Sequence, residues 1–372
     1  MTETLPLNKT LTMNLLYKYR PLNDLLFKEL YYQELYFSSY SELNDPLDLS
    51  VRIEFRPTEI NQIESLFWFL FKTTLKISPE KIADNEKLNN RKLLAFNKNK
   101  KLRTVYKELL FDKLNQLALN QEFISFDKLE NILLSTSNAI PFKLDISNFQ
   151  VEIKRLTTKF LENSYITCFS ERNDNFLMWS HYASKHYGIC LEFTLENSGL
   201  FPYKISKYKN HNKEEYLKRI SERQVEETIF WERIGKVKYQ DKQPYINFFD
   251  FIPVFDNEYD CDLIGISKGW VHEYAYELEN AFLTKTTPWA YENEWRGINI
   301  NFDERKDPEE RIYHYPLECL TGIYFGMRTP EEIKKRIYKI FNRYHTQNIK
   351  YFTCIPISGD KLAFKNWEYY NE

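Results

Sequence analysis

The stretch YITCFSERNDNFLMWSHYASKHYGICLEF, residues 165–193, carries the signals of a strand, a short helix and a second strand in immediate succession. The apolar run Tyr165–Phe169 predicts the first strand, and Asn175–Ser184 predicts the helix. Apolar residues alternate along Gly188–Phe193, a spacing typical of a strand. We therefore expect sheet structure to resume here, after an upstream region with a different spacing of apolar residues.

That upstream region, residues 57–161, has apolar residues at helical spacing, for example Tyr106 and Leu110. Outside it, the predicted strands form short runs without regular βαβ alternation, and neither GxGxxG nor GxxxxGK[ST] occurs. The expected fold is α+β, with a mixed, mainly antiparallel sheet. Residues 1–56 and 162–372 would form the core domain, and residues 57–161 a helical insertion subdomain.

The charge balance argues against a general affinity for polyanions. There are 51 Lys and Arg residues against 53 Asp and Glu, a formal net charge of −2, so no overall attraction to nucleic acid or anionic membranes is expected. Residues 1–12 lack the pattern of a secretory signal, and no stretch reaches the ~18 apolar residues of a membrane span. We expect a soluble, cytoplasmic protein with no membrane partner.

The cysteines and histidines do not indicate a metal site. The five cysteines, at positions 168, 190, 261, 319 and 354, are far apart and form no CxxC pair, so we expect reduced core thiols. His181 and His186 have an i, i+5 spacing, which suits a helical metal pair poorly, and we interpret both as hydrogen-bonding side chains. No GxSxG elbow occurs, which argues against covalent hydrolase chemistry.

Two acidic residues near the C-terminal half of the chain are candidates for acid–base chemistry. Glu292 and Glu294 alternate with their neighbours, so an extended segment would place both carboxylates on one face. Two carboxylates that close raise the pKa of one of them. Alternatively, Arg296 and Lys285 would neutralise the pair in a purely structural network.

Arg20 lies at a predicted strand end, where its guanidinium could bind a phosphate or carboxylate. The alternative is an ion pair with Asp45 or Asp48. Ser170 and Ser38 also lie at strand ends, where each would either orient a ligand or simply end its strand.

The aromatic residues Trp179, Tyr182 and Trp289 lie close in sequence to these polar candidates. Such side chains usually pack in a core, but they also stack on a base or a nicotinamide ring. His181 is the histidine that we expect to face a ligand. High aromatic content alone is weak evidence of function.

Several blocks of sequence carry a resemblance to a known family: Leu16–Arg20 (LYKYR), Tyr36–Ser38, Asn44–Asp48 (NDPLD), Cys168–Ser170, Met178–Ala183 (MWSHYA), His186–Cys190 (HYGIC), Trp289–Arg296 (WAYENEWR) and Ile323–Gly326. In this order they resemble an uncharacterised bacterial family of unknown function. The resemblance implies a cytoplasmic protein of a bacterium or mobile element, and no activity.

The order arginine, serine, Glu-x-Glu is also similar to that of ADP-ribosyltransferases, which are α+β folds built on split antiparallel sheets. The resemblance implies that Arg20 holds a phosphate or ribose of NAD, the substrate, and that Ser170 or Ser38 braces the nicotinamide ribose. Glu294 would stabilise the oxocarbenium-like transition state, and Glu292 would assist the acceptor. Such a protein would be a toxin or phage-defence effector acting on a protein or nucleic acid, and the acceptor stays open.

Two further hypotheses belong to other classes. The first is a non-enzymatic sensor or effector that binds a nucleotide or a protein, its polar network formed by Arg20, Trp179, His181, Glu294 and Arg296. The second is a nuclease that holds a metal ion on Asp45, Asp48 and Glu292.

Overall fold

The computed structural model describes residues 15–45, 47–49, 51–63, 66–67, 84–144, 146–151, 162–194, 203–205, 225–228, 234–249, 278–300, 306–342 and 349–370. The chain divides into two compact units. Unit 1 comprises Met1–Leu43, Ser164–Gln240 and Lys285–Glu372, and unit 2 comprises Asn44–Asn163 and Asp241–Thr284. Unit 2 therefore begins at Asn44 rather than at residue 57, and it includes a second segment that we expected in the core domain.

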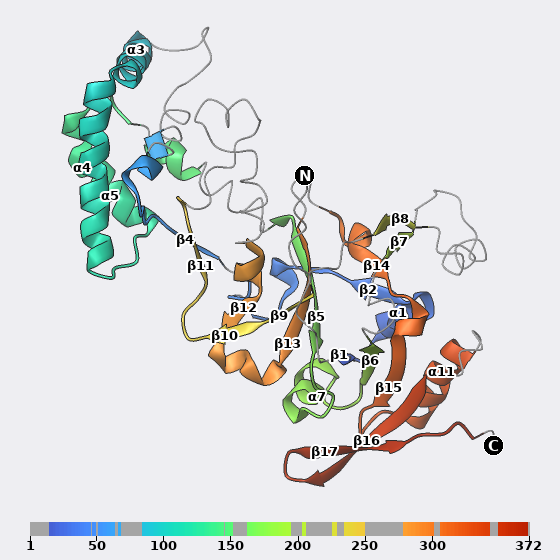
Figure 1. The fold of residues 1–372 in the computed structure, drawn as a ribbon. Coiled ribbons are helices and arrows are strands. Elements are labelled where there is room, and N and C mark those ends of the chain that lie inside the picture. Colours follow the sequence, from blue (N-terminus) through green and yellow to red (C-terminus); the bar gives the residue numbers. More distant parts are fainter. Residues whose placement is uncertain are drawn as a thin grey trace, which may run out of the picture. The chain divides into compact units, whose positions relative to one another are not determined.

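Unit 1 is built on a mixed sheet that has nine strands within the described residues (Figure 1). Their order is β17 (Lys361–Asn366), β16 (Lys350–Ser358), β15 (Leu320–Phe325), β6 (Ile189–Thr194), β1 (Leu15–Arg20), β5 (Ser164–Ser170), β13 (Glu294–Ile300) and β9 (Ile234–Lys236), with β3 (Ser38–Ser39) also paired to β5. In this part of the chain β15 and β16 run parallel, connected by α11 (Glu331–Asn342), and the other pairs are antiparallel. The predicted α+β class with a mainly antiparallel sheet is confirmed.

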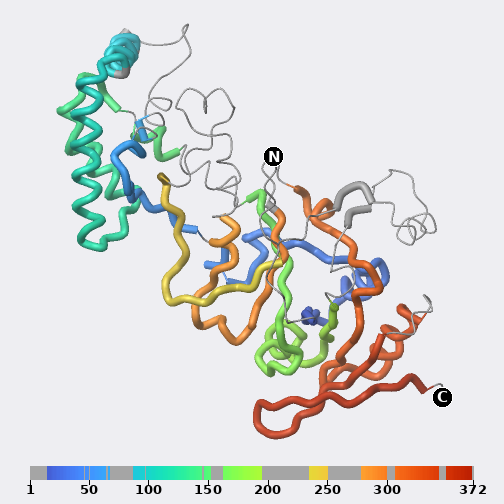
Figure 2. Tube along the Cα trace, in the orientation of Figure 1, coloured from blue at the N-terminus to red at the C-terminus, as the bar shows by residue number. Residues whose placement is uncertain are grey.

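The register of the central strands decides which side chains can meet. Segments distant in sequence form this part of the sheet, as the blue, green and orange parts of the tube show (Figure 2). Ser170 of β5 is paired with Tyr17 of β1 on one side and with Glu294 of β13 on the other. Paired residues point to the same face, and consecutive residues of a strand point to opposite faces. Glu294 therefore lies on one face of the sheet, and Lys18 and Arg20 lie on the other.

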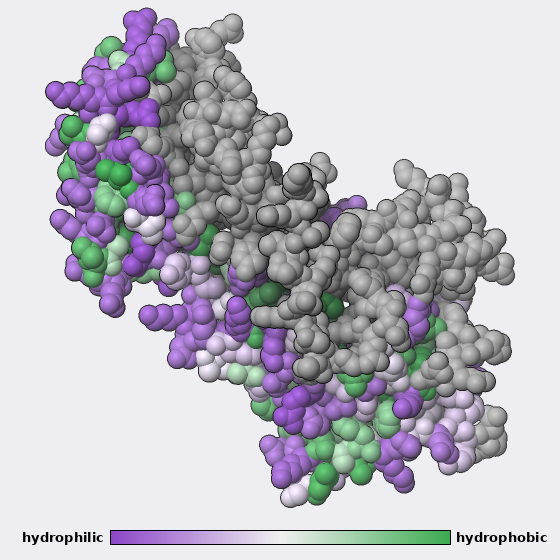
Figure 3. Space-filling model, in the orientation of Figure 1, coloured by the Kyte–Doolittle hydropathy of each residue, from purple (hydrophilic) through white to green (hydrophobic). Residues whose placement is uncertain are grey.

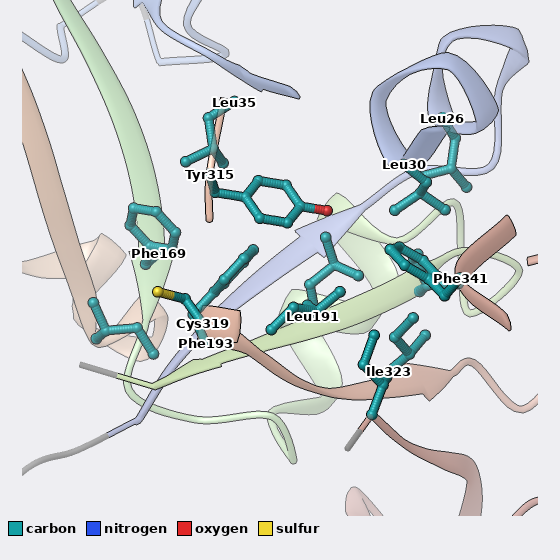
Figure 4. Packing of buried hydrophobic residues seen from close by; sticks show 14 of the residues in the cluster. Leu26, Leu30, Leu35, Phe169, Leu191, Phe193, Tyr315, Cys319, Ile323 and Phe341 are labelled. Atoms are coloured by element: carbon teal, nitrogen blue, oxygen red, sulfur yellow. The ribbon is translucent and has the colours of Figure 1, made fainter. Parts of the chain in front are cut away.

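Different helices cover the two faces. The face with Lys18 and Arg20, here called the α1 face, packs against α1 (Asp24–Tyr32) and α11 through a buried apolar cluster (Figure 4). Among its members are Leu26, Leu30, Phe169, Leu191, Ile323 and Phe341. The opposite face, here called the α7 face, packs against α7 (Phe176–Tyr182), whose Trp179 side chain is fully buried.

The turn between α7 and β6 is held very tightly between neighbouring strands. Ser184, Lys185 and His186 all have positive φ angles, a conformation that costs energy for residues other than glycine. A Cβ on Gly188 would lie 2.2 Å from the carbonyl oxygen of Arg20, and a Cβ on Gly326 would lie 2.1 Å from that of His186. Glycine is therefore required sterically at both positions.

Unit 2 contains the helices of the predicted insertion. They are α3 (Asp84–Lys98), α4 (Lys100–Leu119) and α5 (Phe126–Thr136), with the short 3-10 segments η2 (Ile60–Gln62) and η3 (Ser137–Ala139). β4 (Arg52–Glu54) pairs in parallel with β11 (Tyr245–Asn247), so the segment after Asp241 is tied into this unit. The visible surface of α3, α4 and α5 is mainly hydrophilic with scattered apolar residues (Figure 3).

Smaller elements complete unit 1. A second sheet has the order β2 (Glu34–Tyr36), β14 (Ile312–His314), β7 (Tyr203–Ile205) and β8 (Val225–Thr228), and β10 (Lys238–Gln240) pairs with β12 (Thr284–Thr286). The 3-10 segments are η1 (Tyr40–Glu42), η4 (Thr287–Glu292), η5 (Pro308–Arg311) and η6 (Leu317–Cys319). None of the helices in the described part of the chain combines the length and apolar character of a membrane span.

His314 of β14 should make stability depend on pH. Its ring is buried, and Nδ1 donates to the carbonyl oxygen of Tyr32 at 2.7 Å. Burial lowers the pKa of His314 from 6.5 to about 4. The unfolded chain therefore binds a proton more readily in this range, and the free energy of unfolding should fall by up to about 3 kcal/mol as the pH drops from 6.5 towards 4.

Urea denaturation at a series of pH values measures this effect. The variant His314→Gln keeps a hydrogen-bond donor and has no titrating ring, so its stability should change less over the same range. Parallel profiles for the two proteins would contradict a role of His314.

Candidate functional site

Most of the predicted site residues meet on the α7 face, around a buried group of four charges. Lys285, Glu292, Glu294 and Arg296 are each at most 5% exposed. Lys285 Nζ donates to Glu292 at 2.7 Å and to Glu294 at 3.4 Å. Arg296 holds the Glu294 carboxylate with Nε at 2.8 Å and Nη2 at 2.9 Å. We call these four residues the ion quartet.

The backbone between Glu292 and Glu294 is not the extended segment that the alternation of residues predicts. Glu292 is the last residue of η4, Asn293 has a left-handed conformation with φ of 46°, and Glu294 is the first residue of β13. The expectation of one extended segment is therefore wrong at Glu292. The left-handed residue separates η4 from β13, and both carboxylates still reach Lys285.

The ion quartet shifts the pKa values of its two carboxylates in opposite directions. Burial opposes ionisation of Glu294, but Arg296 and then Lys285 outweigh it and lower its pKa. For Glu292, burial and the charge of Glu294 outweigh Lys285, so its pKa is raised. Tyr182 of α7 donates its hydroxyl to Glu292 as well. The quartet is thus satisfied internally, as a structural network requires.

The remaining candidates on this face have ordinary structural partners. Ser170 Oγ donates to the carbonyl oxygen of Glu292 at 2.6 Å. His181 Nδ1 lies 3.0 Å from the Tyr291 hydroxyl, near the surface. The Trp179 indole donates to the carbonyl oxygen of Asn173 at 2.6 Å.

Trp289 is half-buried beside Lys285 of the ion quartet. The Lys285 ammonium is 4.6 Å from the centre of its ring, a cation–π distance. His186 is buried and stacks nearly parallel to Trp179, and its pKa is lowered by burial and by Arg328. His186 is therefore part of the core beneath α7.

Arg20 and Ser38 are not part of this arrangement. Arg20 lies on the α1 face and binds Glu29 of α1, so the expected partners Asp45 and Asp48 were wrong. Ser38 is in β3, where it is paired with Ile166. The register therefore separates Arg20 from Glu294 by the thickness of the sheet.

The acids proposed for a nuclease have local roles. Asp45 accepts a hydrogen bond from the Leu47 amide at 2.9 Å, and Asp48 accepts one from the Leu49 amide at 2.9 Å. Among the described residues, no group of three His, Cys, Asp or Glu side chains is placed to hold a metal ion. The cysteines at 168, 190, 319 and 354 are free thiols, and Cys261 lies outside the described residues.

A small cavity, partly open to solvent, lies on the α1 face, and its interior has room for about one water molecule. Its charged lining consists of Lys18, Arg20, Glu29 and Glu34, and Tyr36, Tyr315 and three leucines complete it. In the close view, the Tyr315 ring extends over the apolar cluster toward Leu30 (Figure 4).

Lys18 is the residue of this cavity that sequence reasoning missed. Its ammonium donates to the Thr167 hydroxyl at 2.8 Å and to the Cys168 carbonyl at 3.0 Å, both of which are neutral. Burial, and then Arg20, lower the pKa of Lys18 to about 8. A signal was present: Lys18 is two residues from Leu16, so strand alternation places it on the core-facing side.

Comparison with known proteins gives a match to one family model over part of the chain, and no activity. No curated protein and no solved structure matches this chain. Residues 178–297, which include all of the ion quartet, match the family model described as Protein of unknown function (DUF2971), and the resemblance of this part of the chain to an uncharacterised domain is confirmed.

Proposed function

We propose that the protein is a non-enzymatic sensor or effector module that binds a small oxyanion, such as the phosphate group of a mononucleotide, at the cavity on the α1 face. The observation that carries the proposal is the pair of cations Lys18 and Arg20 in this cavity, where Lys18 donates its hydrogen bonds to neutral acceptors. Desolvation and the neighbouring Arg20 lower the pKa of Lys18 in spite of the nearby Glu29, so the positive charge is costly at this position. An anion bound at the two cations would offset that cost.

The size and lining of the cavity restrict the ligand. With room for about one water molecule, the cavity admits an oxyanion group and does not enclose a whole mononucleotide or dinucleotide. Lys18 and Arg20 would bind the anion, and the organic body of the ligand would stay at the open mouth.

This geometry does not favour the other two hypotheses. An ADP-ribosyltransferase-like mechanism needs Arg20 and Glu294 around one substrate, and they lie on opposite faces of the sheet. The nuclease needs free carboxylates, and Asp45, Asp48 and Glu292 each bind a neighbouring donor. Release of nicotinamide from NAD by the purified protein would nevertheless support the transferase.

Calorimetry with adenosine 5′-monophosphate (AMP) tests the proposal. Lys18→Met should weaken AMP binding at least tenfold, since the cation is lost while the length of the side chain is kept. Arg20→Lys should also weaken binding, because it keeps the charge and removes the fork that matches an oxyanion. Lys361→Met, which removes an exposed lysine of β17, is the matched control and should bind AMP like the wild type.

Thermal stability separates a binding role of Lys18 from a structural one. Replacing a buried charge by an apolar group of similar volume is often neutral or stabilising. The melting temperature of Lys18→Met should therefore equal or exceed that of the wild type. The proposal would be wrong if Lys18→Met and Arg20→Lys bound AMP as tightly as the wild type, or if the wild type bound none of AMP, inorganic phosphate and acetate.

A further inference from the structure

We infer that Glu29 occupies the place of the ligand's oxyanion on Arg20, so that a ligand binds by exchanging with this carboxylate. The inference rests on the proposed function and names the residue that sets the affinity of the site. It also gives the chemical class of the ligand: an oxyanion that offers two oxygens to the guanidinium, which is a phosphate or a carboxylate.

The contact between Arg20 and Glu29 has the geometry of ligand recognition. Arg20 Nε donates to Glu29 Oε2 at 2.9 Å, and Nη2 contacts both carboxylate oxygens. This two-pronged arrangement is the one that a guanidinium forms with a bound carboxylate or phosphate. Both side chains also line the cavity, and they are 24% and 15% exposed, so solvent and ligand can reach them.

The position of Glu29 allows it to leave while the fold stays in place. It lies in α1, and that helix is anchored in the core by Leu26 and Leu30, which are fully buried. Glu29 can therefore change its rotamer without removing α1 from the sheet. An incoming anion favours this rotamer change, because it repels Glu29 and offers Arg20 an equivalent partner.

The second acid of the cavity has a different role. Glu34 binds Lys28 at 2.9 Å, and Lys28 is not among the cavity-lining residues. Burial raises the pKa of Glu34. Glu34→Gln thus changes the charge of the cavity by the same unit as Glu29→Gln, but it leaves the Arg20–Glu29 contact intact.

Calorimetry with AMP, inorganic phosphate and acetate tests the exchange. Glu29→Gln should bind the ligand at least tenfold more tightly than the wild type, because the ligand no longer displaces a carboxylate. The gain for Glu34→Gln should be clearly smaller. A gain with AMP and phosphate identifies a phosphate ligand, and a gain with acetate identifies a carboxylate ligand.

Three results of the calorimetry would overturn the inference. The first is unchanged or weaker binding of all three anions by Glu29→Gln, and the second is an equal gain for Glu34→Gln, which would indicate a general charge effect. If the wild type binds AMP through Arg20 in these cases, the proposed function survives. The third is that neither the wild type nor Glu29→Gln binds any of the anions, and then both proposals fail.

Hydrogen exchange on the wild type gives a readout that does not depend on a variant. Release of Glu29 removes a tether between α1 and β1, so the amides of α1 should exchange faster when AMP is bound. Slower exchange in α1 with AMP bound would contradict the exchange of anions.

Discussion

Gly326→Ala is expected to destabilise the protein by at least about 3 kcal/mol, because the added methyl group meets backbone rather than a movable side chain. The new Cβ would lie 2.1 Å from the carbonyl oxygen and 2.7 Å from the carbonyl carbon of His186. The chain cannot shift away easily, since the Gly326 amide donates to Gly188 and the Arg328 amide donates to His186, both at 3.0 Å. Urea denaturation followed by tryptophan fluorescence measures the loss.

Gly359→Ala is the matched control. Gly359 has a φ of +57°, and a Cβ added there would have no atom within 4 Å, so its substitution adds backbone strain without a clash. Its cost should be about 1 kcal/mol. If Gly326→Ala lost no more stability than Gly359→Ala, the tight contact between β15 and the turn before β6 would be refuted.

This turn shows what the sequence could and could not predict. The strand, helix and strand around it follow from local patterns, and the structure has them at β5, α7 and β6. The block HYGIC was noticeable, but nothing in it indicates that Gly188 lies against Arg20 or that His186 lies against Gly326. Those contacts join residues far apart in the chain, which depend on the order and register of the strands.

The site was predicted unevenly for the same reason. Glu292, Glu294 and Arg296 are adjacent in sequence, and their neutralisation with Lys285 was one of the two alternatives. Placing Arg20 with Glu294 required the register of β1, β5 and β13, because a shift of one residue along a strand reverses the face. Strand order is a property of the whole sheet and could not be read from either segment alone.

The cavity was the hardest feature to predict. It is formed by α1, β1, β2, Leu191 of β6 and Tyr315, which approach one another only after the sheet has formed. Alternation along β1 places Lys18 on the same side as Leu16. A lysine on the buried side of a strand, however, usually belongs to an edge strand or extends its ammonium group to solvent. Only the structure shows that the Lys18 ammonium donates to Thr167 and to the Cys168 carbonyl.

Arg296→Met is expected to lower the free energy of unfolding by about 3–5 kcal/mol, the range for removing one partner of a buried ion pair. Arg296 is fully buried and supplies two of the hydrogen bonds to Glu294. Without it, Lys285 is shared between Glu292 and Glu294, and one buried negative charge is left uncompensated. Methionine keeps most of the side-chain volume, so the loss reports charge rather than a cavity.

The double variant Arg296→Met, Glu294→Gln distinguishes an electrostatic cause from lost packing. Glutamine has the shape of glutamate without its charge, so the second substitution should recover more than half of the lost stability, as a double-mutant cycle would show.

The single variant should also regain stability, relative to the wild type, as the pH falls below 4.5. In the wild type the pKa of Glu294 is lowered, so acid removes stability there, whereas in Arg296→Met the uncompensated carboxylate is relieved by a proton. Two results together would refute an electrostatic cause: a double variant no more stable than Arg296→Met at neutral pH, and a single variant with the same pH profile as the wild type. The stability lost in Arg296→Met would then not come from the ion quartet.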